Sequence, residues 1–361
     1  MTSRLPHALD AARYVDPERF ARERERIFAR TWQYAGHASQ IENPGDYFAF
    51  ELHGRSLFAL RDRDGRIRSF YNACAHRAHE LVQGSGNKRV LVCPYHAWTY
   101  QLDGSLRSAP GADRVPGFDA SGICLSAVRT EVIGGFIFVN LDGTADAFET
   151  WYPGLGDALE EYLPDLARLK PVYTREVEER CNWKVSVENY SECYHCRRNH
   201  PTFANGIVDP DDYDIFAQGH MLRHVTRAVS ASAMSYAVDP GSHPRALDYS
   251  SWYLWPTFSF QVYPGNVLNT YAWRALDLRT TQVRRQWFAV DGIESDTLYR
   301  LAEQDLGSTV AEDIRLVESV QRGLESGGYR PGPLVIDPAG GVNSEHSIRT
   351  LHEWLDEAMR V

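Results

Sequence analysis

The sequence predicts an α+β protein whose sheets are antiparallel. The first observation is a hairpin signal, in which two strand-like runs flank Asp64 and Gly65, a dipeptide typical of tight turns. The second is the segment 252–290, where three aromatic and β-branched runs follow one another after short turns, as antiparallel strands do. The third is a pair of segments near the C-terminus with helical periodicity, 308–326 and 347–359.

The composition limits the classes of protein to consider. The 361 residues suffice for one large core or two modest domains. The 38 basic and 48 acidic residues give a net charge of −10, which argues against nucleic acid or an anionic membrane as a partner. No apolar run approaches the roughly 18 residues of a membrane span, and no secretory signal pattern opens the chain. Since six cysteines do not suggest a disulfide framework, we expect a soluble cytoplasmic protein.

We divide the chain into a helical N-terminal arm over residues 1–40, a first domain over 41–150 and a second over 151–361. In the arm, Asp16 is a suitable N-cap and Pro17 a suitable first helical residue, so a helix should begin there.

The first domain is rich in strands. Besides the hairpin, residues 47–52 and 135–140 have the composition of strands, and the second of these closes the domain. The segment 104–122 contains glycine, proline and aspartate, so we expect it to leave the sheet. Residues 142–157 form a link to the second domain.

Two Cys-His pairs lie in this domain. One residue separates Cys74 from His76, two separate Cys93 from His96, and sixteen lie between the pairs. Two thiolates on one iron and two imidazoles on the other are the ligands of a Rieske [2Fe–2S] cluster. The alternative is a structural zinc site. Zinc fingers usually place two cysteines on one side and two histidines on the other, whereas each half here has one of each, which favours the cluster.

A second metal site is expected in the helix that follows Asn182. His195 and His200 are five residues apart, and Pro201 disfavours helical geometry at His200. Residues at this spacing on a straight helix point about 140° apart. We therefore expect the helix to loosen at its end, so that His200 turns towards the same ion. Two histidines and one carboxylate are the ligands of non-haem Fe(II) oxygenases.

Asp313 is our candidate for the carboxylate. It lies in the helix that we expect to begin at Ser308 as N-cap. The neighbouring Glu312 is the alternative ligand if the register differs by one residue. Cys193 and Cys196, which bracket the first histidine, also leave a zinc site open.

The chain resembles the large (alpha) subunit of Rieske non-haem iron oxygenases over nearly its whole length. The resemblance rests on the two Cys-His pairs, on the segment from Asn182 to Pro201, and on Glu312 and Asp313 followed by residues 321–324. It implies a Rieske domain of antiparallel β-sheet for the first domain and a helix-grip catalytic domain with an antiparallel sheet for the second.

The resemblance also implies the roles of individual residues. The implied cluster ligands are Cys74, His76, Cys93 and His96, and the implied ligands of the mononuclear Fe(II) are His195, His200 and Asp313. Glu192 stands where the family usually has an aspartate. That residue bridges a cluster histidine of one subunit to an iron-ligating histidine of the next and passes the electron.

A system of several components follows from the resemblance. The family's subunits form trimers, so we expect a homotrimer. Because the chain has no flavin or nicotinamide motif, electrons from NAD(P)H must come through a separate flavin- or ferredoxin-type reductase. O2 is the implied co-substrate, and the substrate is a small molecule.

The metal helix and the glutamate at position 192 resemble the branch that oxidises betaine, carnitine and choline. Hydroxylation of an N-methyl group there leads to demethylation. An aromatic cage could hold the quaternary ammonium, and its candidates are Trp252, Tyr253, Trp255, Phe258, Phe260, Tyr263, Tyr271 and Trp273. Arg223, Arg227 and Arg274 are candidates for binding a substrate carboxylate.

Three alternatives stay open at this point. The same rings could form an apolar pocket for hydroxylation or dioxygenation of an aromatic molecule. The chain could be a Rieske electron carrier, although its length and the second metal set argue against this. It could also be a zinc-binding interaction protein.

Overall fold

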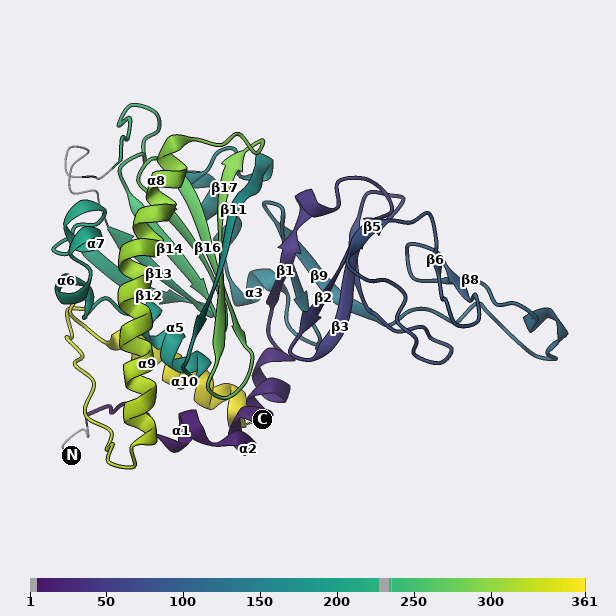
Figure 1. The fold of residues 1–361 in the computed structure, drawn as a ribbon, viewed down its shortest axis with the longest axis horizontal. Coiled ribbons are helices and arrows are strands. Elements are labelled where there is room, and N and C mark those ends of the chain that lie inside the picture. The colour runs from purple at the N-terminus through teal and green to yellow at the C-terminus, as the bar shows by residue number, and fades with distance from the viewer. Residues whose placement is uncertain (1–4, 227–233, 235, 361) are drawn as a thin grey trace. The chain divides into compact units, whose positions relative to one another are not determined.

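The computed structural model describes residues 5–226, 234 and 236–360, which fall into two compact units. One unit is Ala29–Ala145, and the other combines Met1–Phe28 with Asp146–Val361. The predicted α+β class with antiparallel sheets is confirmed (Figure 1). Over the described ranges, no helix has both the length and the apolar composition needed to cross a bilayer.

The Ala29–Ala145 unit contains two antiparallel sheets. The larger has seven strands in the order β1-β10-β9-β4-β3-β2-β5, and the smaller has three in the order β6-β7-β8. The strands of the larger sheet are β1 (Gln33–His37), β2 (Asp46–Leu52), β3 (Arg55–Arg61), β4 (Ile67–Tyr71), β5 (Ser85–Asn87), β9 (Ala127–Ile133) and β10 (Phe136–Asn140). The smaller sheet contains β6 (Leu91–Val92), β7 (Thr99–Tyr100) and β8 (Leu106–Ser108), and two short 3-10 helices are η2 (Ala38–Gln40) and η3 (Ala112–Arg114).

Two sequence expectations can be compared with this unit. The predicted hairpin is β3–β4, and Gly65 at its turn has a φ of +81°, which glycine adopts without strain. The arm expected over residues 1–40 ends earlier than that, because β1 pairs with β10 inside this unit.

The Asp146–Val361 segment contains the second seven-stranded sheet, in the order β11-β17-β16-β15-β14-β13-β12. Its strands are β11 (Leu169–Glu179), β12 (Tyr213–Gln218), β13 (Met221–Thr226), β14 (Tyr249–Leu254), β15 (Phe258–Tyr263), β16 (Val267–Ala275) and β17 (Thr281–Val290). The first of the three runs predicted within 252–290 was expected to be one strand over 252–263, which is wrong, because the chain reverses there between β14 and β15. Pro256 lies at this reversal, where its missing N–H interrupts no ladder.

Helices cover one face of this sheet. Figure 1 shows α8 and α9 running along it, and α5 contacts both α9 and β16. The helical segments after the link are α5 (Trp183–Ser191), α6 (Cys196–Asn199), α7 (Pro201–Gly206), α8 (Asp296–Asp305), η6 (Leu306–Val310), α9 (Ala311–Glu325) and α10 (His346–Arg360). The link itself holds α3 (Phe148–Trp151), α4 (Leu155–Tyr162) and η4 (Leu166–Arg168).

The helix that carries Asp313 does not begin at Ser308. It runs from α8 through the π-helical turn η6 into α9, and the Ser308 hydroxyl donates to the Gln304 carbonyl at 2.6 Å inside it. Of the apolar side chains on this helix, Val317 is buried, whereas Val320 is 50% exposed.

The N-terminal helices belong to the same unit as this sheet. They are α1 (Ala12–Val15), α2 (Pro17–Glu23) and the π-helical turn η1 (Arg24–Phe28). As predicted, Asp16 caps α2 by accepting the Glu18 N–H at 2.9 Å. Tyr14 and Phe28 pack in one buried cluster with Trp183 of α5, so the arm is part of the core.

Candidate metal centres

The chain between α5 and α7 is interrupted twice. Helix α5 is capped by Asn182, whose side chain accepts the Lys184 N–H at 3.1 Å, and it ends before Glu192, which is extended. A second interruption falls at His200, between α6 and α7. The two breaks bring the Nε2 atoms of His195 and His200 to 3.1 Å from each other. The predicted loosening is therefore confirmed, although the helix ends earlier than expected.

Asp313, in the first turn of α9, completes this group. Its Oδ1 lies 3.0 Å from Nε2 of His200 and 3.5 Å from Nε2 of His195. The three ligand atoms lie within 4.8 Å of one another, close enough to bind one metal ion. The structure thus brings together all three residues that the sequence suggested for the mononuclear iron.

A carboxylate also contacts the Nδ1 atom of each imidazole, on the side opposite Nε2. Glu192 accepts a hydrogen bond from Nδ1 of His195, and its other oxygen accepts the His195 backbone N–H at 3.3 Å. Glu312, which the sequence left as an alternative ligand, lies 2.8 Å from Nδ1 of His200. Since both Nδ1 atoms are engaged, both Nε2 atoms face the common point beside Asp313, as metal-binding histidines do.

The charges of the site favour a cation. Burial by itself would lower the pKa of His195, but Asp313 and Glu192 outweigh it and raise that pKa to about 10. The pKa of His200 is also raised, because Asp313 and Glu312 outweigh the effect of burial. Two imidazoles and a carboxylate in such a field fit a divalent iron.

Cys193 and Cys196 form a disulfide across the turn that holds His195. Neither sulfur is therefore a thiolate that could bind zinc. The zinc interpretation of this segment, which the sequence left open, has no thiolate ligand in this structure. The disulfide itself was not expected, because the composition gave no sign of one.

The two loops with Cys-His pairs share one backbone conformation. The backbone carbonyl of Cys74 accepts a hydrogen bond from the N–H of Ala78 at 2.9 Å, and that of Cys93 accepts one from the N–H of Ala97 at 3.0 Å. Both alanines have positive φ, 60° and 57°, which an L-residue adopts only where the fold demands it. Two loops with the same conformation are suited to hold the two halves of one cluster.

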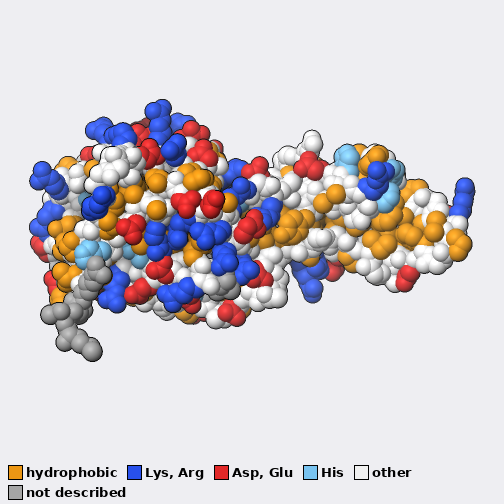
Figure 2. All heavy atoms as spheres, turned by 90° about the horizontal axis from the view of Figure 1, so that it is seen from below, with side chains coloured by type: hydrophobic (Ala, Val, Ile, Leu, Met, Phe, Trp, Pro, Cys, Tyr) orange, Lys and Arg blue, Asp and Glu red, His pale blue; other side chains and the backbone are white. Residues whose placement is uncertain are grey.

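Side chains in these loops agree with the Rieske arrangement. The cysteines are buried, whereas the rings of His76 and His96, 4.7 Å apart, approach each other nearer the surface. Figure 2 shows histidine side chains, in pale blue, exposed on the surface of the protein. Tyr100 is an addition that the sequence did not suggest: its hydroxyl lies 3.0 Å from Sγ of Cys74.

A small cavity opens onto the His195–His200–Asp313 group. Its aromatic lining consists of Tyr190, Phe203, Tyr213, Tyr249, Tyr263 and Tyr271. Of the eight aromatic residues suggested from the sequence, two are in this set; the others missed the cavity because the sequence did not show which face each strand turns inward. Neither Arg223 nor Arg274 lines it, and Arg227 lies outside the described residues.

Comparison with known proteins bears on both sites. Residues 166–361 match the catalytic domain of the ring-hydroxylating alpha subunit, and residues 31–119 match the Rieske [2Fe–2S] domain. The chain belongs to the ring-hydroxylating alpha-subunit family of Rieske oxygenases. As a Rieske oxygenase, it is an oxidoreductase with a [2Fe–2S] cluster and a mononuclear iron, and the family typically uses O2 and NAD(P)H through a reductase. The electron-carrier and zinc-protein alternatives are therefore wrong.

Several relatives of this Rieske oxygenase act on quaternary amines, according to their names. The carnitine monooxygenase oxygenase subunit of Escherichia coli (strain K12) is 35% identical and aligns over 96% of this chain and 92% of that protein. The chloroplastic choline monooxygenase of Amaranthus tricolor is 30% identical over 95% of this chain and 76% of that protein. The crystal structure of the quaternary ammonium Rieske monooxygenase CntA with L-carnitine has a TM-score of 0.84 and 32% identity, over 98% of this chain and 96% of that one.

Proposed function

We propose that this Rieske oxygenase hydroxylates an N-methyl group of a small quaternary or N-methylated amine. The observation that carries the proposal is the tyrosine-lined cavity that opens onto His195, His200 and Asp313. Tyrosine faces attract an ammonium group through cation–π interaction. The names of the carnitine and choline monooxygenase relatives support the same class of substrate.

The reaction requires one O2, two electrons and two protons for each N-methyl group. One oxygen atom enters the methyl C–H bond and the other leaves as water. The N-hydroxymethyl product then breaks its C–N bond, releasing formaldehyde and the demethylated amine with a proton. A separate flavin- or ferredoxin-type reductase supplies the electrons from NAD(P)H.

In this proposal His195, His200 and Asp313 hold the iron, and the iron supplies the activation of O2. Glu192 and Glu312 hold the two imidazoles with Nε2 turned to the metal. The aromatic walls place the methyl group and keep bulk water away from it. Cys74, His76, Cys93 and His96 hold the cluster.

The electron path belongs to an assembly. We assign electron storage to Ala29–Ala145 and oxygenation to the other unit. In a homotrimer, Glu192 would join His195 of its own chain to a cluster histidine of a neighbouring chain. We place this assembly in the cytoplasm, where the reductase has access to NAD(P)H.

Oxygen uptake with a compatible reductase and NADH tests the proposal, on a panel of betaines, carnitine, choline and simple aromatic compounds. We expect uptake matched by formaldehyde for an N-methylated compound. The His195→Ala variant should lose turnover and keep the absorption spectrum of its cluster. Coupled uptake without formaldehyde, on an aromatic compound, would replace this proposal with aromatic hydroxylation or dioxygenation.

A further inference from the structure

A row of polar side chains crosses the sheet that forms one wall of the cavity. His224 pairs in register with Ser251, Ser251 with Gln261, and Gln261 with Asn269, on four consecutive strands from β13 to β16. Partners in register project from the same face of a sheet. All four are buried, with exposures of 2%, 1%, 4% and 0%, and the first three line the cavity.

Part of this row has no hydrogen-bond partner. Nε2 of His224 and Oγ of Ser251 are both buried and unpaired, and so are both polar atoms of the Asn269 side chain. Ser251 lies close to the hydroxyls of Tyr190 and Tyr249 but forms no well-aligned hydrogen bond with them. Buried polar groups in native proteins are nearly always hydrogen-bonded, so unpaired groups facing a cavity indicate a missing partner.

Gln261 differs from its neighbours in the row. Its amide donates to the hydroxyl of Tyr249 at 3.0 Å, and its carbonyl oxygen accepts from that of Tyr263 at 3.2 Å. These contacts hold two tyrosine rings of the cavity in place. The groups that remain available to a ligand in the cavity are therefore His224 and Ser251.

His224 acts as a neutral group. Burial lowers its pKa to about 3, so the ring is uncharged near neutral pH. The hydroxyl of Tyr213 lies 3.0 Å from Nδ1 of His224. Because burial raises the pKa of Tyr213 well above its usual value, this phenol keeps its proton and shares a hydrogen bond with Nδ1. Nε2, which has no partner, can then donate to or accept from a ligand hydroxyl, according to which ring nitrogen carries the proton.

The charges around the cavity determine which oxygen-containing group of a substrate can bind there. Among the described residues that line it, no lysine or arginine is present, and the carboxylates are those of Glu192 and Asp313. A substrate carboxylate would be buried here without a lysine or arginine partner, which is unfavourable. A hydroxyl can form a hydrogen bond with His224 in either direction and another with Ser251 at no such cost.

We propose that His224 and Ser251 bind a hydroxyl group of the substrate, which makes the substrate an N-methylated amino alcohol. This inference rests on the proposed function and names the substrate class of the same site. The ammonium lies among the tyrosine rings, and the hydroxyl is held at the polar row on the sheet.

Binding to the oxygenase without its reductase, measured by calorimetry, tests the inference with three probes. Choline carries a hydroxyl, glycine betaine carries a carboxylate in its place, and tetramethylammonium has neither. The unmodified protein should bind choline more tightly than glycine betaine. Ser251→Ala and His224→Gln should each weaken choline binding about 10-fold, the usual effect of losing one hydrogen bond, and leave tetramethylammonium binding unchanged.

Ser250→Ala is the matched control. Ser250 is next to Ser251 on β14, but its hydroxyl donates to the backbone of His224 at 3.0 Å and does not line the cavity. Tighter binding of glycine betaine than of choline overturns the inference. So does an equal loss of choline and tetramethylammonium in Ser251→Ala, or no loss at all. These outcomes leave the proposed function standing if any N-methylated compound still yields formaldehyde, whereas no formaldehyde from the whole panel overturns both.

Discussion

Glu312 meets His200 from the side opposite Asp313, at 2.8 Å from Nδ1. Removing its charge should let the imidazole rotate and lower the basicity of Nε2. We expect Glu312→Gln to reduce the affinity of the mononuclear site for Fe(II) about 10- to 100-fold. Competition with a chelator, followed by counting iron beyond the two atoms of the cluster, measures this affinity.

The control for this variant is Glu303→Gln, the same change at an exposed position of α8. It should bind iron like the unmodified protein. If Glu312→Gln does so too, Glu312 does not position His200.

Glu179 is a buried carboxyl group at the end of β11, away from the metal ligands in sequence. Burial, aided by the charge of Asp313, raises its pKa from 4.5 to about 7. A group with a raised pKa in the folded state stabilises the fold below its unfolded pKa, and this contribution is lost as the pH rises from 4.5 through 7. The loss amounts to about 3 kcal/mol for a shift of this size.

Glu179→Gln cannot ionise and should therefore lose less stability between pH 5 and pH 8 than the unmodified protein. Thermal unfolding at the two pH values measures the difference. Glu178→Gln, at the exposed neighbouring position, should behave like the unmodified protein. A Glu179→Gln profile that follows the unmodified one would show that Glu179 ionises normally in the fold.

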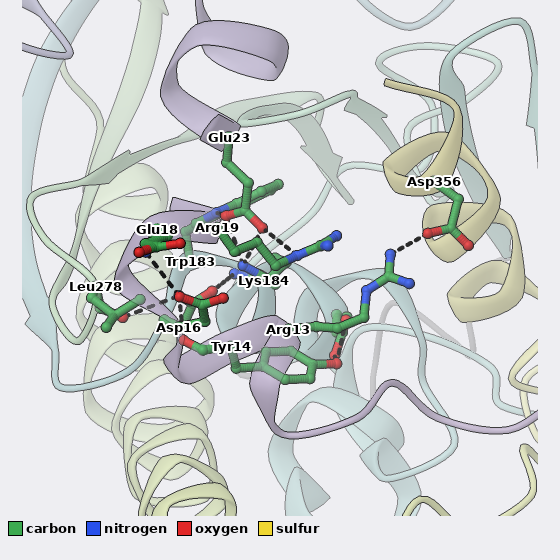
Figure 3. A network of polar contacts seen from close by, with 12 residues as sticks. Arg13, Tyr14, Asp16, Glu18, Arg19, Glu23, Trp183, Lys184, Leu278 and Asp356 are labelled. Atoms are coloured by element: carbon green, nitrogen blue, oxygen red, sulfur yellow. Dashed lines mark hydrogen bonds and ion pairs between the residues drawn. The ribbon is translucent and has the colours of Figure 1, made fainter. Parts of the chain in front are cut away.

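At the scale of elements, α5 is fixed by a buried ion pair from the N-terminal arm. The carboxylate of Glu23 accepts from Nζ of Lys184 at 2.8 Å and from Nε1 of Trp183 at 2.9 Å, as Figure 3 shows. Glu23 is 0% exposed and Lys184 3%. Because α5 leads directly to Glu192, this contact also sets the position of the metal-binding turn.

Glu23→Ala should leave the Lys184 ammonium buried without a partner. We expect a loss of about 3–5 kcal/mol in the free energy of unfolding, which denaturant titration measures. The exposed pair of Asp165 and Arg168, 2.8 Å apart, is the comparison. Asp165→Ala should cost at most about 1 kcal/mol, because water and salt screen that pair. Equal effects of the two changes would mean that the arm does not stabilise α5.

At the scale of the whole molecule, the proposed trimer predicts that two inactive chains can restore each other. His195→Ala removes a proposed iron ligand and His96→Ala a proposed cluster ligand, so each variant alone should be inactive. Co-expressed chains should regain N-demethylation, because a cluster on one chain can serve the iron of another. Formaldehyde release from purified mixed oligomers measures the recovery.

The two variants mixed after separate purification, with no exchange of subunits, are the control and should stay inactive. Co-expressed oligomers that contain both variants and show no activity would place electron transfer within a single chain. A mass of one chain, 41.0 kDa, in sedimentation would contradict the trimer directly.

Much of this protein was predictable from short stretches of sequence. The two Cys-His pairs and the spacing of His195 and His200 before Pro201 predicted the metal chemistry, because local turns can bring residues that are close in sequence to one site. The antiparallel strands and the cap at Asp16 also followed from local residue types. Tertiary structure was needed for features that join distant segments. Only strand register shows that His224 and Ser251 lie side by side. Only helix rotation places Asp313 beside both Nε2 atoms and Glu312 beside Nδ1 of His200. Only packing brings Glu23 to Lys184.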